Sequence, residues 1–150
     1  MFKHLLLATD GSALSDVAIY KGLELARSTG AKVTGITVMP EYHLMSYAVE
    51  SLQDTQQQFQ FETRRHAEQV LSRLAQAATQ AQVACDTLAV PGDHPYEQII
   101  VAAEQRQCDL IVMASHGRKG IKGLLLGSET HKVLTHTQIP VLVFHPETAR

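Results

Sequence analysis

Glycines and basic residues are concentrated in one segment toward the C-terminal end of the chain. Four of the nine glycines lie between Gly117 and Gly127, directly after an apolar run and directly before a helical pattern that begins at Ser128. Glycine lets a backbone approach a ligand closely, and the N-terminus of a helix favours an anion. Arg118, Lys119 and Lys122 add positive charge to the segment. The pattern predicts a phosphate site, although composition alone also allows a surface loop followed by a capped helix.

Other phosphate-binding and catalytic motifs are absent from the sequence. Counting from Gly117, Lys122 stands where a P-loop requires its second glycine, and no Gly-Lys-Ser/Thr occurs. The first apolar run is not followed by Gly-x-Gly-x-x-Gly, and no Gly-x-Ser-x-Gly is present. His131, His136 and His145 lack a metal-binding spacing such as His-Glu-x-x-His. P-loop, dinucleotide-binding, serine hydrolase and zinc chemistry are therefore disfavoured.

Strand-like and helix-like segments alternate along the chain. Uniformly apolar or β-branched runs predict strands, and apolar residues at helical spacing predict the helices between them. The expected strands are Leu5–Ala8, Lys32–Met39, Val83–Val90, Leu110–Met113 and Pro140–Phe144, and the expected helices span about Leu14–Ala26, Phe59–Ala81, Tyr96–Gln105 and Ser128–Thr135. Ser12 or Ser15 can cap the first helix, and Gly30 can end it. Residues 41–54 follow no pattern and are expected to form a mobile loop, either a lid or a partner surface.

This alternation predicts a single-domain α/β fold over residues 1–150, a doubly wound five-stranded parallel sheet with helices on both faces. With the strand order 3-2-1-4-5, a crevice opens beyond the carboxyl ends of strands 1 and 4. Two segments are expected to meet there, Ala8–Gly11 after strand 1 and Ala114–Gly117 after strand 4. The predicted phosphate segment therefore lies beside this crevice.

Length and composition fit one compact domain, with 150 residues of which 45% are hydrophobic and 19% charged. A net charge of -2 argues against a nucleic-acid-binding protein. Cys85 and Cys108 lie in apolar contexts, so each is expected to be a free, buried thiol. The short first apolar run fits neither a signal peptide nor a membrane span, so we expect a cytoplasmic protein without a membrane partner.

The residues after strands 1 and 4 resemble the universal stress protein family, and the resemblance covers the whole chain. The family's nucleotide motif is Gly, two residues, Gly, nine residues, Gly, then Ser or Thr. Gly117 and Gly127-Ser128 match its last elements, whereas Ala114 replaces the leading glycine and adds one methyl group. Further matches are Thr9–Ser12, Val38 at the end of strand 2, and Lys132–Leu134 ahead of Pro140–Val143.

The resemblance implies that ATP or AMP, with or without Mg²⁺, binds in this crevice, and that a homodimer forms along the strand Val141–Phe144. Asp10 would bind a ribose hydroxyl or Mg²⁺, and Thr9 and Val38 would flank the adenine close to Ala8. Met113 and Ala114 would line the base and the sugar. The phosphates would be surrounded by Gly117, Arg118, Gly127, Ser128, Glu129 and Thr130, with His116 within reach.

Several of these residues have a simpler interpretation that the sequence leaves open. Asp10 could only stabilise its turn together with Ser12, and Ser128 could serve only as the N-cap of its helix. His116 could be exposed or bonded to the backbone. Glu129 suits the positive end of the helix dipole, but it would repel a phosphate unless its carboxylate points outward or meets Mg²⁺.

Three classes of function are consistent with these features. The first is a stress-response regulator or sensor whose adenine nucleotide alters its contacts with protein partners that the sequence does not identify. The second is a slow ATPase or a nucleotidyl-transfer enzyme, because related crevices host adenylate chemistry. The third is a dimeric interaction protein that does not bind nucleotide, an alternative that Ala114 supports. The sequence pairs no carboxylate with a base near the expected γ-phosphate, so at most slow hydrolysis is expected.

Overall fold

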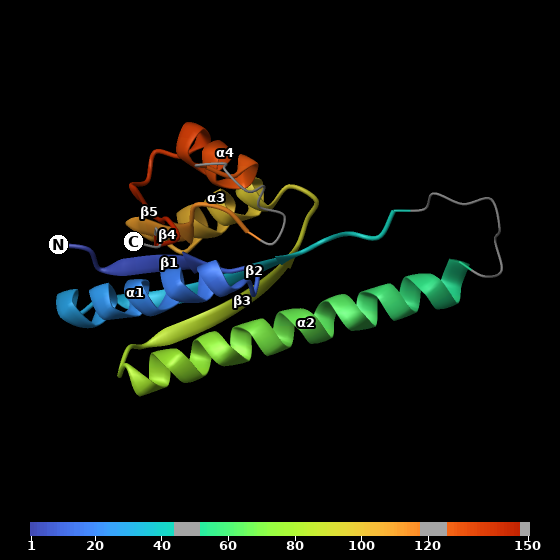
Figure 1. Cartoon of the computed structure of the whole chain (residues 1–150), viewed down its shortest axis with the longest axis horizontal. Coiled ribbons are helices and arrows are strands. Elements are labelled where there is room, and N and C mark those ends of the chain that lie inside the picture. Colours follow the sequence, from blue (N-terminus) through green and yellow to red (C-terminus); the bar gives the residue numbers. More distant parts are fainter. Residues whose placement is uncertain (44–51, 118–125, 148–150) are drawn as a thin grey trace.

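The computed structural model describes residues 1–43, 52–117 and 126–147. Its sheet contains five parallel strands in the order β3-β2-β1-β4-β5, as the sequence predicted. The strands are β1 (His4–Ala8), β2 (Lys32–Met39), β3 (Cys85–Pro91), β4 (Leu110–Ala114) and β5 (Val141–Phe144). The order places β1 and β4 side by side at the centre, so their carboxyl ends flank the expected crevice (Figure 1).

Helices cover both faces of this sheet, which confirms the doubly wound arrangement (Figure 1). They are α1 (Ala13–Thr29), α2 (Leu52–Gln80), α3 (Pro95–Gln105) and α4 (Ser128–His136). Buried side chains from α1 and α2 form one apolar core with alternate residues of β1 and β4. A second core joins α3 and α4 to the opposite face of the same strands. Each central strand is therefore buried on both sides, which explains its uninterrupted apolar sequence.

Helix α1 begins and ends as its sequence predicts. Ser12 is the N-cap, and its side chain accepts a hydrogen bond from the Ser15 backbone N–H. Gly30 ends the helix in the left-handed conformation with φ of 72°. The cap fixes the start of α1 directly after the turn that carries Asp10.

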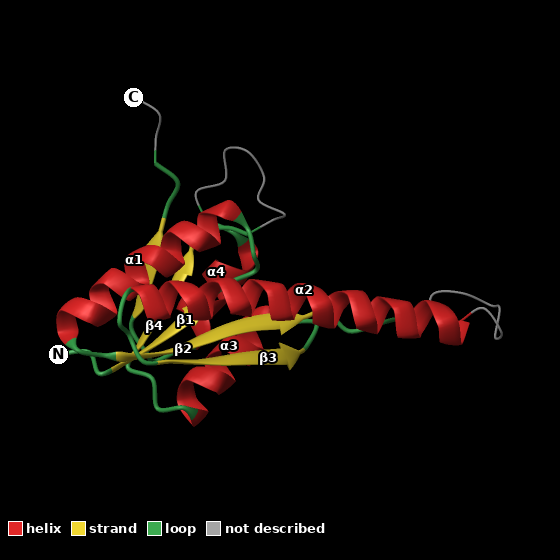
Figure 2. Cartoon of the chain, turned by 90° about the horizontal axis from the view of Figure 1, so that it is seen from below, coloured by secondary structure: helices red, strands yellow, loops and turns green. Residues whose placement is uncertain are grey.

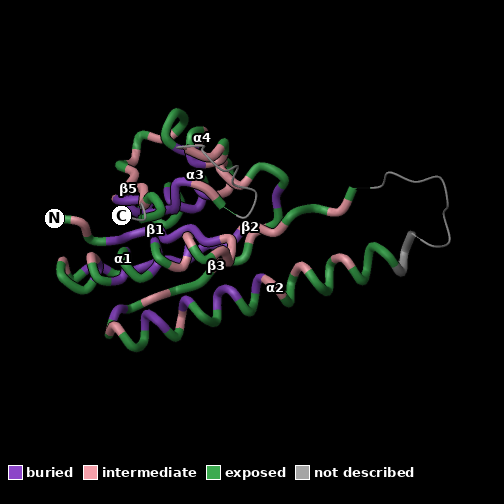
Figure 3. The backbone as a smooth tube through the Cα atoms, in the orientation of Figure 1, coloured by how far each residue is buried: buried purple, intermediate pink, exposed green. Residues whose placement is uncertain are grey.

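Helix α2 begins at Leu52, inside the stretch where the sequence predicted a loop at 41–54. The sequence of residues 52–58 has no apolar stripe, but leucine and glutamine are good helix formers, and the helix includes residues 55–58 although their side chains are exposed. Its C-terminal half packs on the sheet through buried Ala67, Val70, Leu71 and Leu74. Its N-terminal half extends beyond the sheet, where Phe61 is 67% exposed (Figures 1, 2 and 3). The remaining part of the predicted loop, 44–51, lies outside the described residues.

Both cysteines are free thiols, as expected, but only Cys108 is fully buried. Cys85 lies on edge strand β3 and is half-buried. Burial raises the pKa of the Cys108 thiol to about 11 and raises the pKa of Cys85. A high pKa keeps a thiol protonated and therefore unreactive at neutral pH. In the described part of the chain, no helix is long and apolar enough to span a membrane.

His4 at the start of β1 is a buried titratable group whose charge state affects folding. Its Nε2 lies 2.8 Å from Thr34 Oγ1, and only 7% of the residue is exposed. Burial lowers the pKa of His4 below 6.5, and the positive charge of Lys32 lowers it further. The unfolded chain therefore binds a proton that the folded chain resists, so the free energy of unfolding falls as pH decreases from about 6.5.

We expect the variant His4→Gln to lose much of this pH dependence. Glutamine can keep a polar contact with Thr34 without titrating, at a loss of about 1 kcal/mol at pH 7. Urea unfolding midpoints at pH 5, 6, 7 and 8 measure the effect, with His131→Gln as an exposed-histidine control. Parallel pH profiles for His4→Gln and the unmodified chain would show that His4 is not the responsible group.

Candidate functional site

The segments after β1 and β4 meet at the carboxyl edge of the sheet, as the sequence predicted. A Cβ atom placed on Gly117 would collide with Oδ2 of Asp10. The Gly117 backbone and the Asp10 carboxylate are therefore in direct contact where the two segments meet. Asp10 and Gly11 are partly buried, and Gly117 is exposed at the rim.

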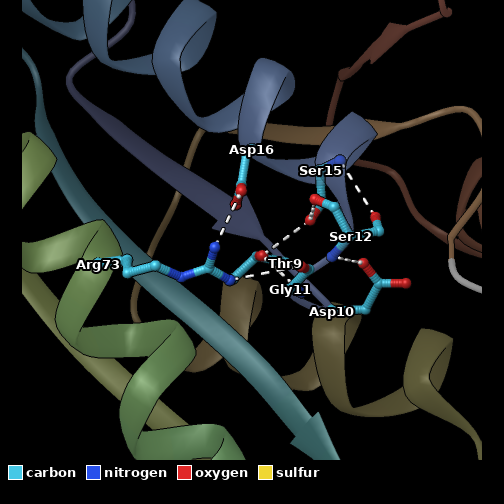
Figure 4. Close-up of polar contacts among 7 residues, drawn as sticks. All are labelled: Thr9, Asp10, Gly11, Ser12, Ser15, Asp16 and Arg73. Atoms are coloured by element: carbon cyan, nitrogen blue, oxygen red, sulfur yellow. Dashed lines mark hydrogen bonds and ion pairs between the residues drawn. The ribbon is translucent and has the colours of Figure 1, made fainter.

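Hydrogen bonds within the turn after β1 hold Asp10 in place (Figure 4). Oδ1 of Asp10 accepts the Ser12 backbone N–H at 3.0 Å. Buried Thr9 accepts the Gly11 N–H at 3.1 Å, and its Oγ1 lies 3.0 Å from Ser15 Oγ. Asp10 therefore does stabilise its own turn, while its Oδ2 faces Gly117.

Hydrogen bonds hold the start of α4 against the end of β4. The Gly127 N–H donates to the Ser115 carbonyl at 2.6 Å. A Cβ on Gly127 would lie 3.1 Å from both Ser115 O and His116 Cα, so the backbone there would have to shift by a few tenths of an ångström to admit a side chain. The buried Thr130 hydroxyl donates to the Ala114 carbonyl at 2.9 Å. Thr130 thus positions α4, and its hydroxyl has a partner other than a phosphate.

Gly127 is the N-cap of α4, and as a glycine it has no side chain with which to cap the helix. Ser128 is the first helical residue and is exposed, so the structure contradicts the interpretation of Ser128 as the N-cap. The first N–H groups of a helix lack partners within the helix, and they attract anions. The N-terminus of α4 therefore presents backbone N–H donors and the exposed Ser128 hydroxyl at this edge of the sheet.

Glu129 also lies in the first turn of α4, but its carboxylate is directed to α3. Oε2 accepts the Tyr96 backbone N–H at 2.9 Å, and Oε1 lies 3.7 Å from Lys132 Nζ. Helix α3 needs this partner because its own N-cap, His94, makes no side-chain capping bond. The predicted repulsion between Glu129 and a phosphate is therefore reduced, and only the Glu129 backbone remains a candidate contact.

The residues expected to surround a base lie together at the carboxyl ends of β1, β2 and β4. Ala8 and Met113 are buried in the core on the α3 and α4 face, and half-buried Val38 packs against the same core. Ala114, at 8% exposure, ends β4 beside them. Half-buried His116 contacts its neighbour, with Nδ1 3.4 Å from the Gly117 carbonyl, which matches the backbone-bonded interpretation. Arg118 lies outside the described residues.

The universal stress protein family model matches residues 1–145 of the chain. The chain belongs to the universal stress protein family. Universal stress protein YxiE of Bacillus subtilis is 28% identical over 159 residues, covering 95% of this chain and 99% of YxiE. The similarity extends over nearly the full length of both proteins.

Two solved structures show the same fold. MJ0577 of Methanocaldococcus jannaschii superposes with a TM-score of 0.84 at 24% identity and 99% coverage of both chains. A universal stress protein family member from Arabidopsis thaliana, solved with AMP bound, gives a TM-score of 0.68 at 17% identity, covering 97% of this chain and 92% of that one. The strand order of the universal stress proteins therefore agrees with the sheet described above.

The described residues fit the adenine nucleotide that the universal stress protein motif implies. Ser115 is 0% exposed, and its Oγ has no hydrogen-bond partner among the residues described, so a buried polar group remains to be satisfied beside the motif. A Cβ would fill the space at Gly117 or crowd the backbone at Gly127. Sequence reasoning could not select Ser115, because its burial depends on how α4 packs against the end of β4.

Within the described ranges, one group of side chains has the composition of a metal site. Ligand atoms of Glu41, His43 and Asp93 lie within 4.8 Å of one another. His43 Nε2 is 2.5 Å from Asp93 Oδ2, and the Glu41 N–H donates to Asp93 Oδ1 at 3.4 Å. All three are exposed, and the imidazole and carboxylate already satisfy one another. The sequence did not indicate this group because 50 residues separate His43 from Asp93.

Proposed function

We propose that this universal stress protein binds an adenine nucleotide, ATP or AMP, in the crevice between the carboxyl ends of β1 and β4. The observation that carries the proposal is the close approach of Gly127, the N-cap of α4, to Ser115 and His116 at the end of β4. A side chain at Gly127 would crowd this backbone, and the first turn of α4 offers N–H donors suited to phosphate. The Arabidopsis relative that was solved with AMP bound supports the choice of ligand.

The proposed contacts divide the crevice into an apolar part and an anion-binding part. Ala8, Thr9, Val38, Met113 and Ala114 would surround the base and the sugar, and Asp10 would bind a ribose hydroxyl or Mg²⁺. Bound Mg²⁺ would neutralise phosphate charge. The phosphates would contact the backbone of Gly117, Gly127, Ser128, Glu129 and Thr130 and the Ser128 hydroxyl, with Arg118 and His116 nearby.

The protein would act as a stress-response regulator or sensor, because binding without efficient chemistry suits a switch. A ligand changes the population of two conformations only through its different affinities for them. In this proposal a protein partner distinguishes the nucleotide-bound state from the nucleotide-free state. Its location in the cytoplasm remains a prediction.

Direct binding is the test of this function. Calorimetric titration with ATP and AMP, together with mass spectrometry of nucleotide released from the purified protein, measures affinity and identity. Retained adenine nucleotide or micromolar binding supports the proposal. Absence of heat at millimolar nucleotide would contradict it and favour the dimeric interaction protein that does not bind nucleotide.

We expect any ATP turnover to be slower than about 1 s⁻¹, below the usual range for enzymes. Fast phosphoryl transfer needs a positioned nucleophile, metal ligands and charge stabilisation together. The proposed contacts are mainly amides and hydroxyls, with Thr130 already bonded to Ala114. Steady-state phosphate release measures turnover. Faster hydrolysis that disappears in Ser128→Ala or Asp10→Ala would instead support the ATPase or nucleotidyl-transfer alternative.

A further inference from the structure

Arg73 of α2 reaches from outside the crevice to the turn that carries Asp10 (Figure 4). Its Nη1 lies 3.2 Å from Asp16 Oδ2, and its Nη2 donates to the Gly11 carbonyl at 3.3 Å. Arg73 and Asp16 are 57 residues apart in the sequence. One guanidinium therefore connects α2 both to the turn and to the first turn of α1.

Two further residues of α2, His66 and Val70, lie close to Gly11 in the same turn. Gly11 has φ of 82°, and a Cβ there would lie 2.7 Å from Val70 Cγ2 and 3.3 Å from His66 Cε1. His66, Val70 and Arg73 follow helical spacing, so they form one stripe along α2. Side chains of α2 therefore pack against the turn at Gly11, and hydrogen bonds within the turn hold Thr9 and Asp10.

We propose that Arg73 is a positioning residue for nucleotide binding and couples α2 to the state of the crevice. This inference rests on the proposed function. Thr9 and Asp10 directly precede Gly11, so any freedom of the Gly11 peptide is transmitted to both candidate ligand contacts. If the turn adopts its binding-competent conformation only part of the time, the apparent affinity for nucleotide is reduced by that fraction.

The coupling acts in both directions. If Arg73 favours the binding-competent turn, a bound nucleotide must favour the Arg73 contacts by the same free energy. Nucleotide binding would then restrain α2 near residues 66–76, although α2 contributes no proposed nucleotide contact. Part of α2 projects past the sheet, so this restraint would extend toward a surface that a partner can reach (Figure 2).

The geometry also distinguishes arginine from lysine. A planar guanidinium can bind two acceptors at once, whereas a single ammonium group cannot hold both in the same geometry. Arg73→Lys keeps the charge but gives up one of the two contacts. Arg65 lines the same surface hollow as Arg73 and Gly11, so Arg65→Ala removes an equal charge from the same helix.

Calorimetry with ATP on the unmodified chain, Arg73→Ala, Arg73→Lys and Arg65→Ala tests the affinity. We expect about fivefold weaker binding for Arg73→Ala, a smaller loss for Arg73→Lys, and no change for Arg65→Ala. Melting temperatures are expected to stay within about 2 °C, because the ion pair is exposed. Equal ATP affinity in all four proteins would overturn the inference and leave the proposed function intact.

Hydrogen exchange separates coupling from a merely structural role. In the unmodified chain, ATP is expected to slow exchange in peptides covering both 9–16 and 66–76. In Arg73→Ala, the slowing at 66–76 is expected to disappear while that at 9–16 persists. Retained slowing at 66–76 in Arg73→Ala would contradict the coupling, and failure of the unmodified chain to bind ATP or AMP would overturn the proposed function and this inference together.

Discussion

Replacing Gly127 by valine is expected to weaken ATP binding by about 100-fold or more, a loss of about 2.7 kcal/mol. The Cβ alone would lie 3.1 Å from Ser115 O and His116 Cα, and valine adds two methyl groups at that point. The backbone of α4 must then move away from β4, which displaces the N–H groups proposed to bind phosphate. Calorimetric titration measures the change. The ATP affinity of Gly127→Ala is expected to lie between those of the unmodified chain and Gly127→Val.

Two controls separate this effect from general destabilisation. Val133 is a fully buried residue of α4, so Val133→Ala weakens the packing of the same helix without crowding the crevice. We expect that folded Val133→Ala binds ATP normally. Ala114→Gly restores the leading glycine of the family motif, and its affinity is expected to be equal or higher. Unchanged ATP affinity in Gly127→Val would show that the nucleotide site is placed wrongly.

Sequence patterns predicted the strand order and the crevice because these depend on features repeated along the chain. The strands β1 and β4 are apolar throughout since both faces are covered, and Gly30 ends α1 because it accepts a left-handed conformation. The meeting of Asp10 with Gly117 followed from the sheet order alone. Such features need no knowledge of individual side-chain partners.

The details that sequence reasoning did not predict depend on hydrogen-bond partners that are distant in the sequence. Glu129 bonds to Tyr96, 33 residues earlier, so a first-turn carboxylate that looked like a phosphate neighbour instead caps another helix. Arg73 is an exposed cation on a long helix, where such a side chain is ordinarily solvated, and its acceptors belong to other parts of the chain. The first residues of α2 carry no apolar stripe, so periodicity could not place the start of that helix at Leu52.

The edge strand β5 is the feature that predicts association with a second copy of the chain. It pairs with β4 on one side, and all four of its residues, Val141 to Phe144, are half-buried. Leu142 and Phe144 pack against one core and Val141 against the other, so the strand is apolar on both faces. An apolar edge with unpaired backbone groups invites strand pairing, and a two-fold partner would cover both edges at once.

We therefore expect that the chain sediments as a dimer at micromolar concentration, and that Val141→Lys shifts it to the 16.5 kDa monomer. A lysine at the paired edge would place two like charges close to the two-fold axis and bury them against apolar side chains, which strongly opposes association. Val141 also contacts the core within one chain, so Val143→Lys serves as a second variant if the first folds poorly. Thr87→Lys places the same charge on the exposed opposite edge, β3, and is expected to remain dimeric. Sedimentation of the unmodified chain as a monomer would contradict the predicted dimer. If both β5 variants sediment as dimers, β5 is not the interface and the chain pairs through another surface.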